Sequence, residues 1–403
     1  MPIQWLSSGG VTAPRGFRAG GSYAGVKTYG PEPRLDVGLL ISDVEATVAG
    51  VFTTNRICGA PVTVCRERLM SGVARALVVN SGCSNVAVQS GVADAEQMTR
   101  IAAAHLGVKA EQTFVASTGV IGRRLPMDKL QRGIEAIAPD AQGSDAFSRA
   151  IMTTDTVAKS RAAELSINGV SYRIGAAAKG VGMSHPNMAT VLCFLTTDAP
   201  VAAPFLQQAL KRVADLTLNM IDIDMDTSTS DTMLLFANGL AGGPQLVEGG
   251  PGAEQFEAAL LEVCTALARD LARDGEGART LIEVVCRNAK TDEDARLVAR
   301  TVVSSPLVKT MVTGRDPNPG RILAATGRSG ADVDVSRIGV WIGKEVAFAN
   351  GAATDTPYDA LRAALMHDEV QLVVDLGLGS STATAWGCDL TEEYVKINAH
   401  YTT

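Results

Sequence analysis

The stretch that decides the fold spans residues 179–195 and reads KGVGMSHPNMAT followed by VLCFL. Gly180 and Pro186 interrupt regular structure in its first part, whereas the apolar run 191–195 is rich in β-branched and aromatic residues. We therefore predict an irregular segment that leads into a buried strand beginning at Thr190. This arrangement places a hydroxyl group at the mouth of the strand.

A hydroxyl at that place can act as a nucleophile under one condition. Threonine needs a base within hydrogen-bond reach, and its own α-amine can serve once the chain is cut before it. Ala189 is small, so its carbonyl group is open to attack by the Thr190 hydroxyl. An ordinary strand start is the alternative interpretation, and the residue types alone leave both open.

Residues 179–190 as a whole resemble the processing and active-site motif of the ornithine acetyltransferase family, also called the bifunctional glutamate N-acetyltransferase family. The resemblance implies that the precursor cuts itself between Ala189 and Thr190. It would give an α chain, residues 1–189, and a β chain from residue 190, whose new first residue carries the acetyl group.

Further motifs extend the resemblance from about residue 50 to residue 403. One departure is Pro319, which stands where the family usually has Trp. The matching segments are STGVIG (117–122), IMTTD (151–155), DTSTSD (226–231), DGEG (274–277), SPLVKT (305–310), the DPN segment from Asp316 and the C-terminal tail.

The STGVIG segment is typical of a strand that runs into a glycine-rich turn, where free backbone N–H groups can point at a ligand or simply form the turn. In the resembling family, its Thr and Gly supply the oxyanion donors, which correspond here to the Thr118 hydroxyl and the Gly119 amide. The resemblance also implies substrate contacts from Thr153, Lys179 and Glu276, and from Asn398 and Thr403 of the tail. Our own inference is that Lys179 faces a carboxylate and Glu276 an ammonium group.

The activity that the resemblance implies is transfer of acetyl from N-acetylornithine to glutamate through acetyl-threonine, in arginine biosynthesis. A self-processed amidohydrolase or aminopeptidase would share the nucleophile, and a non-catalytic binding protein could use the same fold. Family members with and without acetyl-CoA activity share these motifs, so acetyl-CoA stays open as a second donor. We expect no other cofactor, and the resemblance implies an α2β2 assembly.

Composition and charge narrow the class of protein. The chain has 403 residues, 46% of them hydrophobic, and its 36 basic and 43 acidic residues give a net charge of −7 without blocks of like charge. This balance gives no electrostatic support for nucleic-acid binding and favours small polar substrates. Neither a P-loop nor GxGxxG is present.

Cysteine, histidine and aspartate patterns bear on metals and on the compartment. The seven cysteines show no CxxC spacing and the four histidines lie far apart, so we expect buried thiols and no catalytic metal. Asp222, Asp224 and Asp226 alternate, but Thr227 and Met233 occupy the Gly and Glu positions of a calcium loop, which favours a polar turn network. Without a signal-like or membrane-spanning run, we expect a cytoplasmic protein.

The fold class expected is α/β, and the resemblance implies a layered αββα sandwich over residues 1–280 with a second α/β domain over 281–403, whose tail returns to the active site. Within the first, Asn168 and Gly169 predict a two-residue hairpin. Within the second, we predict helices at 291–303, 320–326 and 357–366, and strands near Leu307, near 338–350 and at 369–376.

Overall fold

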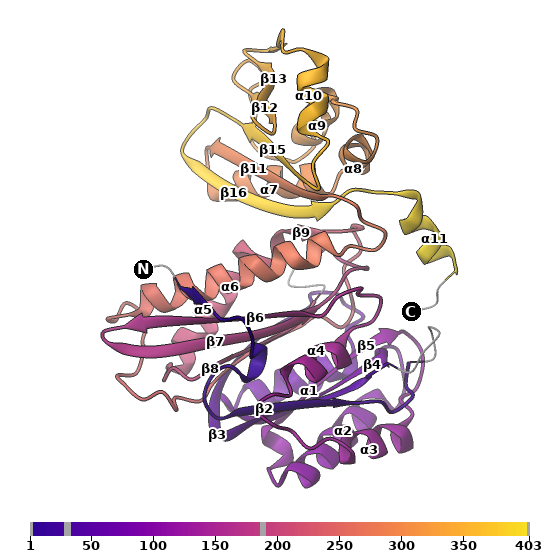
Figure 1. The fold of residues 1–403 in the computed structure, drawn as a ribbon, viewed down its shortest axis with the longest axis vertical. Coiled ribbons are helices and arrows are strands. Elements are labelled where there is room, and N and C mark those ends of the chain that lie inside the picture. Colours follow the sequence, from indigo (N-terminus) through magenta and orange to yellow (C-terminus); the bar gives the residue numbers. More distant parts are fainter. Residues whose placement is uncertain (1–2, 28–33, 186–190, 401–403) are drawn as a thin grey trace.

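The computed structural model describes residues 3–27, 34–185 and 191–400, so Ala189, Thr190 and Thr403 lie outside the described residues. Two mixed sheets organise this part of the chain (Figure 1). The layered α/β class predicted from the sequence is confirmed.

The larger sheet has nine strands in the order β1-β6-β7-β8-β10-β3-β4-β5, with β2 paired to β3. Its strands are β1 (Gln4–Trp5), β2 (Phe17–Ser22), β3 (Val37–Phe52), β4 (Val73–Cys83), β5 (Thr113–Val120), β6 (Lys159–Ile167), β7 (Val170–Lys179), β8 (Leu192–Thr197) and β10 (Thr232–Ala237).

The central strand β8 is buried on both faces, as its apolar run predicts. Cys193 belongs to one hydrophobic core and Phe194 to the other, because successive side chains of a strand point to opposite faces. The strand begins at Leu192, two residues after the predicted start. Its parallel partner β10 begins at Thr232, which lies opposite Leu192 and sets the start of the pairing.

The predicted hairpin is present between β6 and β7. Asn168 and Gly169 both have positive φ angles, 52° and 83°, as a two-residue type I′ turn requires. The second strand of this hairpin ends at Lys179, which therefore lies at the end of β7, next to β8.

Helices cover the larger sheet. The long helix α6 contacts β6 and β7 of this sheet and also β11 and β16 of the second sheet, so one hydrophobic core continues through both parts. The helices of this part are α1 (Ala60–Leu69), α2 (Gly91–Leu106), α3 (Met127–Glu135), α4 (Ser144–Ile151), α5 (Ala203–Leu216) and α6 (Ala253–Arg273), with short 3-10 turns η1 (Gly10–Thr12), η2 (Ala110–Gln112) and η3 (Leu218–Met220).

The second sheet has seven strands in the order β14-β13-β12-β15-β11-β16-β9. Its elements are β9 (Ile221–Asp222), β11 (Leu281–Ala289), α7 (Asp292–Val303), α8 (Pro306–Thr313), α9 (Pro319–Gly327), β12 (Gly339–Ile342), β13 (Glu345–Ala349), β14 (Ala352–Ala353), α10 (Tyr358–Ala364), β15 (Glu369–Asp375) and β16 (Ser381–Cys388). The predicted elements of this part are present within a few residues, with one exception.

The exception is the strand predicted near Leu307, which is wrong. Those residues form the helix α8, which starts with Pro306 in its first turn, where a missing N–H costs nothing. Val308, Met311 and Val312 are buried on one side of it at helical spacing, a pattern that the short apolar run concealed.

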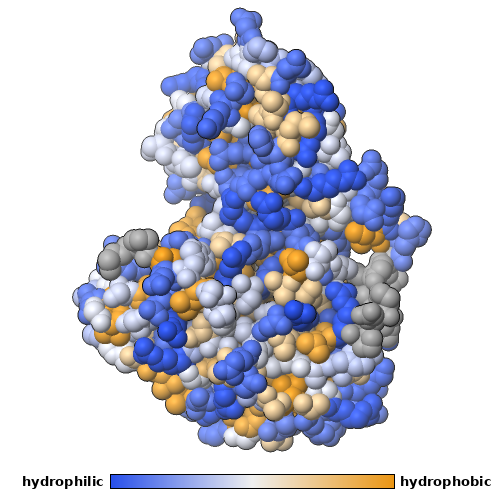
Figure 2. Space-filling model, in the orientation of Figure 1, coloured by the Kyte–Doolittle hydropathy of each residue, from blue (hydrophilic) through white to orange (hydrophobic). Residues whose placement is uncertain are grey.

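The strand β9 comes from residues before 280 and yet pairs with β16 of the second sheet. The division at residue 280 stays a prediction. Beyond β16, the helix α11 (Glu392–His400) extends to the side of the molecule near the larger sheet (Figure 1). Figure 2 shows hydrophilic side chains gathered over the narrow middle between the two parts.

Candidate active site

One pocket brings together the predicted site residues that the structure describes. It is lined by residues at the ends of β5 and β7, after α4, after α6 and on α11, namely Thr118, Gly119, Thr153, Lys179, Glu276 and Asn398. Val191 lines the same pocket, so Thr190 is joined directly to one of its lining residues. Ala189, Thr190 and Thr403 are the predicted site residues that lie outside the described part.

The proposed oxyanion donors sit where β5 runs beside β4. Gly119 has a φ of 121°, and a Cβ there would lie 2.5 Å from the carbonyl carbon of Gly82, so the position requires glycine. The Thr118 hydroxyl accepts a hydrogen bond from the Lys179 ammonium group at 3.2 Å. Because a hydroxyl that accepts still has a proton to donate, Thr118 keeps a donor for a ligand.

Lys179 is backed by three further buried charges, and we call these four residues the charged wall: Asp155, Lys159, Lys179 and Asp274. The Asp155 carboxylate accepts from the Lys159 ammonium at 2.8 Å and from the backbone amides of Thr153 at 3.0 Å and Gly180 at 3.2 Å. Lys159 also pairs with Asp274. The sequence analysis missed Asp155, Lys159 and Asp274.

The charges of the charged wall shift the pKa values of its own residues. Burial opposes the ionised form of Asp155, yet the nearby ammonium groups of Lys159 and Lys179 lower the pKa of its carboxyl below the usual value. Burial lowers the pKa of Lys179, and the field of Asp155 counters part of that effect. The Lys179 amino group therefore reaches the pocket with the buried carboxylate of Asp155 behind it.

The pocket is also lined by Ser228, Thr229, Ser230 and Asp231, which we call the hydroxyl wall. Asp231 is fully buried, and this burial raises the pKa of its carboxyl well above the usual value. Its Oδ2 atom has no hydrogen-bond partner among the described residues. The environment therefore favours a neutral carboxyl group on this side.

Glu276 also lines the pocket, and hydrogen bonds hold both its backbone and its side chain. Its backbone N–H donates to the Val181 carbonyl at 2.9 Å, and its carboxylate accepts from the Asn398 side chain at 2.8 Å. A Cβ on Gly182 would lie 2.5 Å from that carboxyl group, so the carboxylate packs directly over the glycine backbone. The C-terminal helix α11 thus reaches the pocket through Asn398.

Comparison with known proteins agrees with this geometry. A family model described as the ArgJ family matches residues 18–403. The chain belongs to the ArgJ family. The arginine biosynthesis bifunctional protein ArgJ of Dehalococcoides mccartyi is 46% identical over 402 residues, covering 100% of this chain and 99% of the relative. The protein of the same name from Symbiobacterium thermophilum is 48% identical, with 100% of each chain covered.

A solved structure of ArgJ from Bacillus halodurans is also similar. It is 42% identical with a TM-score of 0.50, and the match covers 51% of this chain and 97% of the solved chain. The solved chain is therefore about half as long as this one.

The run DIDMDTSTSD, residues 222–231, forms the polar turn network that its sequence favours. Asp224 accepts from the backbone amides of Met183 at 2.6 Å and Ser184 at 2.7 Å, and the Thr227 hydroxyl donates to the His185 carbonyl at 2.9 Å. This run therefore holds the segment that leads toward the predicted cleavage position, a role the alternating carboxylates did not reveal.

Residues 3–27, 34–185 and 191–400 show neither a metal-binding cluster nor a membrane-spanning helix. They contain no group of three or more His, Cys, Asp or Glu side chains placed to hold a metal ion. Over the same ranges, no helix combines the length and the apolar character needed to cross a membrane.

Proposed function

We propose that the protein is a self-processed threonine acetyltransferase that moves acetyl from N-acetylornithine to glutamate in arginine biosynthesis. The observation that carries the proposal is the convergence of the oxyanion donors, Lys179, Glu276 and the tail on one pocket next to Val191. Membership of the ArgJ family and the names of its relatives support it.

The first step is cleavage of the precursor. The Thr190 hydroxyl attacks the Ala189 carbonyl carbon, the C–N bond breaks and an ester forms between the two residues. Water then hydrolyses the ester, which leaves a carboxylate on Ala189 and a free α-amine on Thr190. The half-length solved relative supports this step, because residue 190 lies near the middle of the chain.

The second step is acetyl transfer by the new β chain. The α-amine takes the hydroxyl proton while Thr190 Oγ attacks the acetyl carbonyl, and Thr118 and Gly119 donate to the oxyanion. The bond to the ornithine nitrogen breaks, and that nitrogen takes the proton. The amine of glutamate then attacks the acetyl ester, which returns free Thr190 and releases N-acetylglutamate.

Both substrates are charged at their ends, and the pocket offers charges of both signs. We assign Lys179 to a substrate carboxylate and Glu276 to the ornithine ammonium group, with Thr153 as a polar contact. A carboxylate accepts several hydrogen bonds, so Glu276 can hold both Asn398 and an ammonium group. We assign Thr403 to the same substrate on the resemblance alone.

Mass spectrometry of the intact chains tests the proposal. The purified protein should give two chains, the second beginning Thr-Val-Leu-Cys, and N-acetylornithine alone should add one acetyl group to that chain. Glutamate should then remove it as N-acetylglutamate. Thr190→Ala should stay uncut and unlabelled.

Two results would contradict this function. Release of free acetate at the same rate with and without glutamate would favour a self-processed hydrolase. An uncut chain that takes up no acetyl would favour a non-catalytic binding protein.

Cofactor use and assembly are part of the same proposal. We propose that no bound cofactor takes part, so enzyme dialysed against a chelator should keep its full activity with N-acetylornithine. An assay with acetyl-CoA and glutamate decides whether acetyl-CoA is a second donor. Native mass spectrometry should find the α and β chains together as α2β2.

A further inference from the structure

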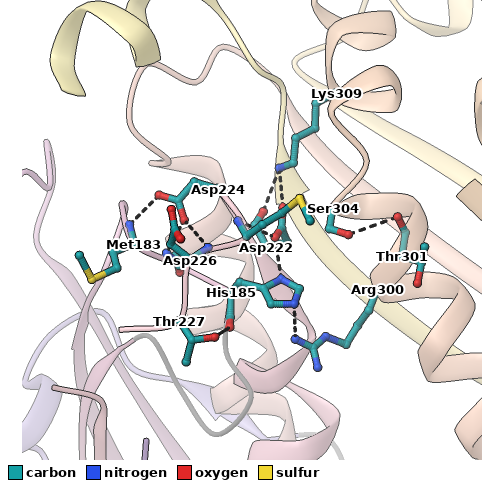
Figure 3. A network of polar contacts seen from close by, with 12 residues as sticks. Met183, His185, Asp222, Asp224, Asp226, Thr227, Arg300, Thr301, Ser304 and Lys309 are labelled. Atoms are coloured by element: carbon teal, nitrogen blue, oxygen red, sulfur yellow. Dashed lines mark hydrogen bonds and ion pairs between the residues drawn. The ribbon is translucent and has the colours of Figure 1, made fainter. Parts of the chain in front are cut away.

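A polar network links the segment before the predicted cleavage position to the second part of the molecule (Figure 3). The His185 ring contacts Asp222 through Nδ1 at 2.7 Å and Arg300 through Nε2 at 3.0 Å. Arginine only donates, so Nε2 accepts from Arg300, and Nδ1 carries the proton that is donated to Asp222. The two partners thus fix both the tautomer and the orientation of the ring.

Asp222 is itself held by the second part. The Lys309 ammonium, on α8, lies 3.0 Å from Asp222 Oδ2 and donates to the backbone carbonyls of Asp222 at 3.1 Å and Cys388 at 3.0 Å. Lys309 and Asp222 are both buried. Arg300, on α7, comes from the same part, so two cations of the second part determine where the His185 ring sits.

The backbone around His185 is fixed as well. Besides the bonds that the Met183 and Ser184 amides donate to Asp224, the Ile223 amide donates to the Ser184 carbonyl at 2.7 Å, and the His185 amide donates to the Asp226 carbonyl at 3.1 Å. Figure 3 shows Met183, Asp224 and Asp226 on one side of the His185 ring and Arg300 on the other.

The chain after the predicted cleavage position is held by Thr232, which directly follows the run 222–231. The Thr232 amide donates to the Val191 carbonyl at 3.1 Å, at the start of the β8–β10 pairing. Residues 222–232 therefore hold His185 on one side and Val191 on the other. The attack of a hydroxyl on a nearby carbonyl depends steeply on such positioning, since a misplacement of about 1 Å can cost roughly 10²-fold in rate.

We infer that Arg300 and Lys309 position the chain for cleavage through His185 and Asp222, so that the precursor is cut only after its second part has folded against the first. The inference rests on the proposed self-cleavage. These four side chains do not line the acyl pocket. They are positioning residues for cleavage, and acetyl transfer by the processed enzyme does not need them.

Cleavage kinetics of the full chain test this inference. The chain is made by cell-free translation, and the cut fraction is followed on gels for wild type, Arg300→Gln and Arg296→Gln, which lies one turn earlier on α7. Arg300→Gln should slow cleavage by at least about tenfold, a fraction of the loss that misplacement can cause. Arg296→Gln should cut at the wild-type rate. Once fully cut, Arg300→Gln should transfer acetyl with a kcat close to that of wild type.

A second variant distinguishes loss of the polar network from damage to the helix α7. His185→Ala removes the ring without changing the helix, and it should slow cleavage as much as Arg300→Gln. The double variant should be no slower than either single variant, because both remove one shared contact.

The possible outcomes are distinct. Wild-type speed of cleavage in Arg300→Gln and His185→Ala would overturn the inference and leave the proposed function intact. Equal losses in cleavage and in the kcat of the processed enzyme would mean general damage and would also overturn it. If Arg300→Gln does not fold, His185→Ala alone decides. A wild-type chain that is never cut would instead contradict the proposed function.

Discussion

The charged wall and the hydroxyl wall each contain one fully buried carboxyl group, and the pKa values of these two groups are shifted in opposite directions. Asp155 is 1% exposed and Asp231 is 2% exposed. The pKa of Asp155 is lowered, since two lysines and two backbone amides offset its burial, whereas the pKa of Asp231 is raised by burial that its surroundings do not offset. Neighbouring groups, and not burial itself, decide the charge of a buried acid.

The difference between the walls suits the proposed chemistry. The charged wall presents a supported cation and the Thr118 hydroxyl, which together favour negative charge on a substrate. The hydroxyl wall adds polar groups and one acid, Asp231, whose pKa is raised. Substitutions that remove these groups test whether the two walls differ in this way.

The largest expected effect comes from Lys159→Met. This change leaves the buried carboxylates of Asp155 and Asp274 without their shared cation, and breaking a buried pair in this way costs about 3–5 kcal/mol. Urea unfolding of the full chain measures the loss. Lys290→Met, which breaks an exposed pair with Asp332, should leave the free energy of unfolding almost unchanged. Equal effects of the two changes would contradict the charged wall.

The next effect is on catalysis. Thr118→Val removes a predicted oxyanion donor and should lower kcat by about 10²–10³-fold, equivalent to about 2.7–4 kcal/mol. Ser228→Ala, on the hydroxyl wall, should lower kcat by less than about tenfold, or 1.4 kcal/mol. Steady-state rates with N-acetylornithine and glutamate measure both. If Ser228→Ala lowers kcat more than Thr118→Val does, the oxyanion donors belong to the hydroxyl wall and Thr118 is not one of them.

The pH dependence of stability should have opposite signs at the two acids. The pKa of Asp155 is below its usual value of 3.8, so the advantage of wild type over Asp155→Asn exists above that pH and is lost as the pH falls. The pKa of Asp231 is above it, so the folded chain holds more protons there. Wild type should therefore lose stability relative to Asp231→Asn as the pH rises above about 4, by at most about 1.4 kcal/mol per pH unit.

Urea unfolding of the three proteins at several pH values between about 2 and 7 measures these differences, because the contribution of Asp155 is lost only below its usual pKa of 3.8. Parallel curves for wild type and Asp231→Asn would mean that Asp231 is ionised like Asp155. The comparison between the walls would then fail.

The smallest expected effect is at the tail. Asn398→Ala removes the bond to Glu276, and a net hydrogen-bond contribution of about 0.5–1.5 kcal/mol predicts a rise in KM of roughly two- to tenfold with little change in kcat. Glu276→Gln should raise KM for N-acetylornithine more, because it also removes the anion that we assign to the ammonium group. A fall in kcat alone for Asn398→Ala would show that the tail acts on the chemical step.

Much of the fold and of the candidate site could be predicted locally. The alternation of the strands, the Asn168–Gly169 turn and most helices follow from the periodicity of neighbouring residues. The motifs led to Thr118, Gly119, Thr153, Lys179, Glu276 and Asn398, which the structure brings to one pocket. The strand predicted near Leu307 failed because a short apolar run fits a buried strand and a buried helix equally well.

By itself, the sequence determined the α/β class, the family and the residue types of the pocket, because these depend on short motifs and local patterns. Only the tertiary structure decided which charges meet. Lys159 pairs with Asp274, 115 residues away, and His185 meets Arg300 at the same separation. No local pattern predicts such pairs, since they form only when distant stretches of the chain pack together, and that packing lowers the pKa of Asp155 while it raises the pKa of Asp231.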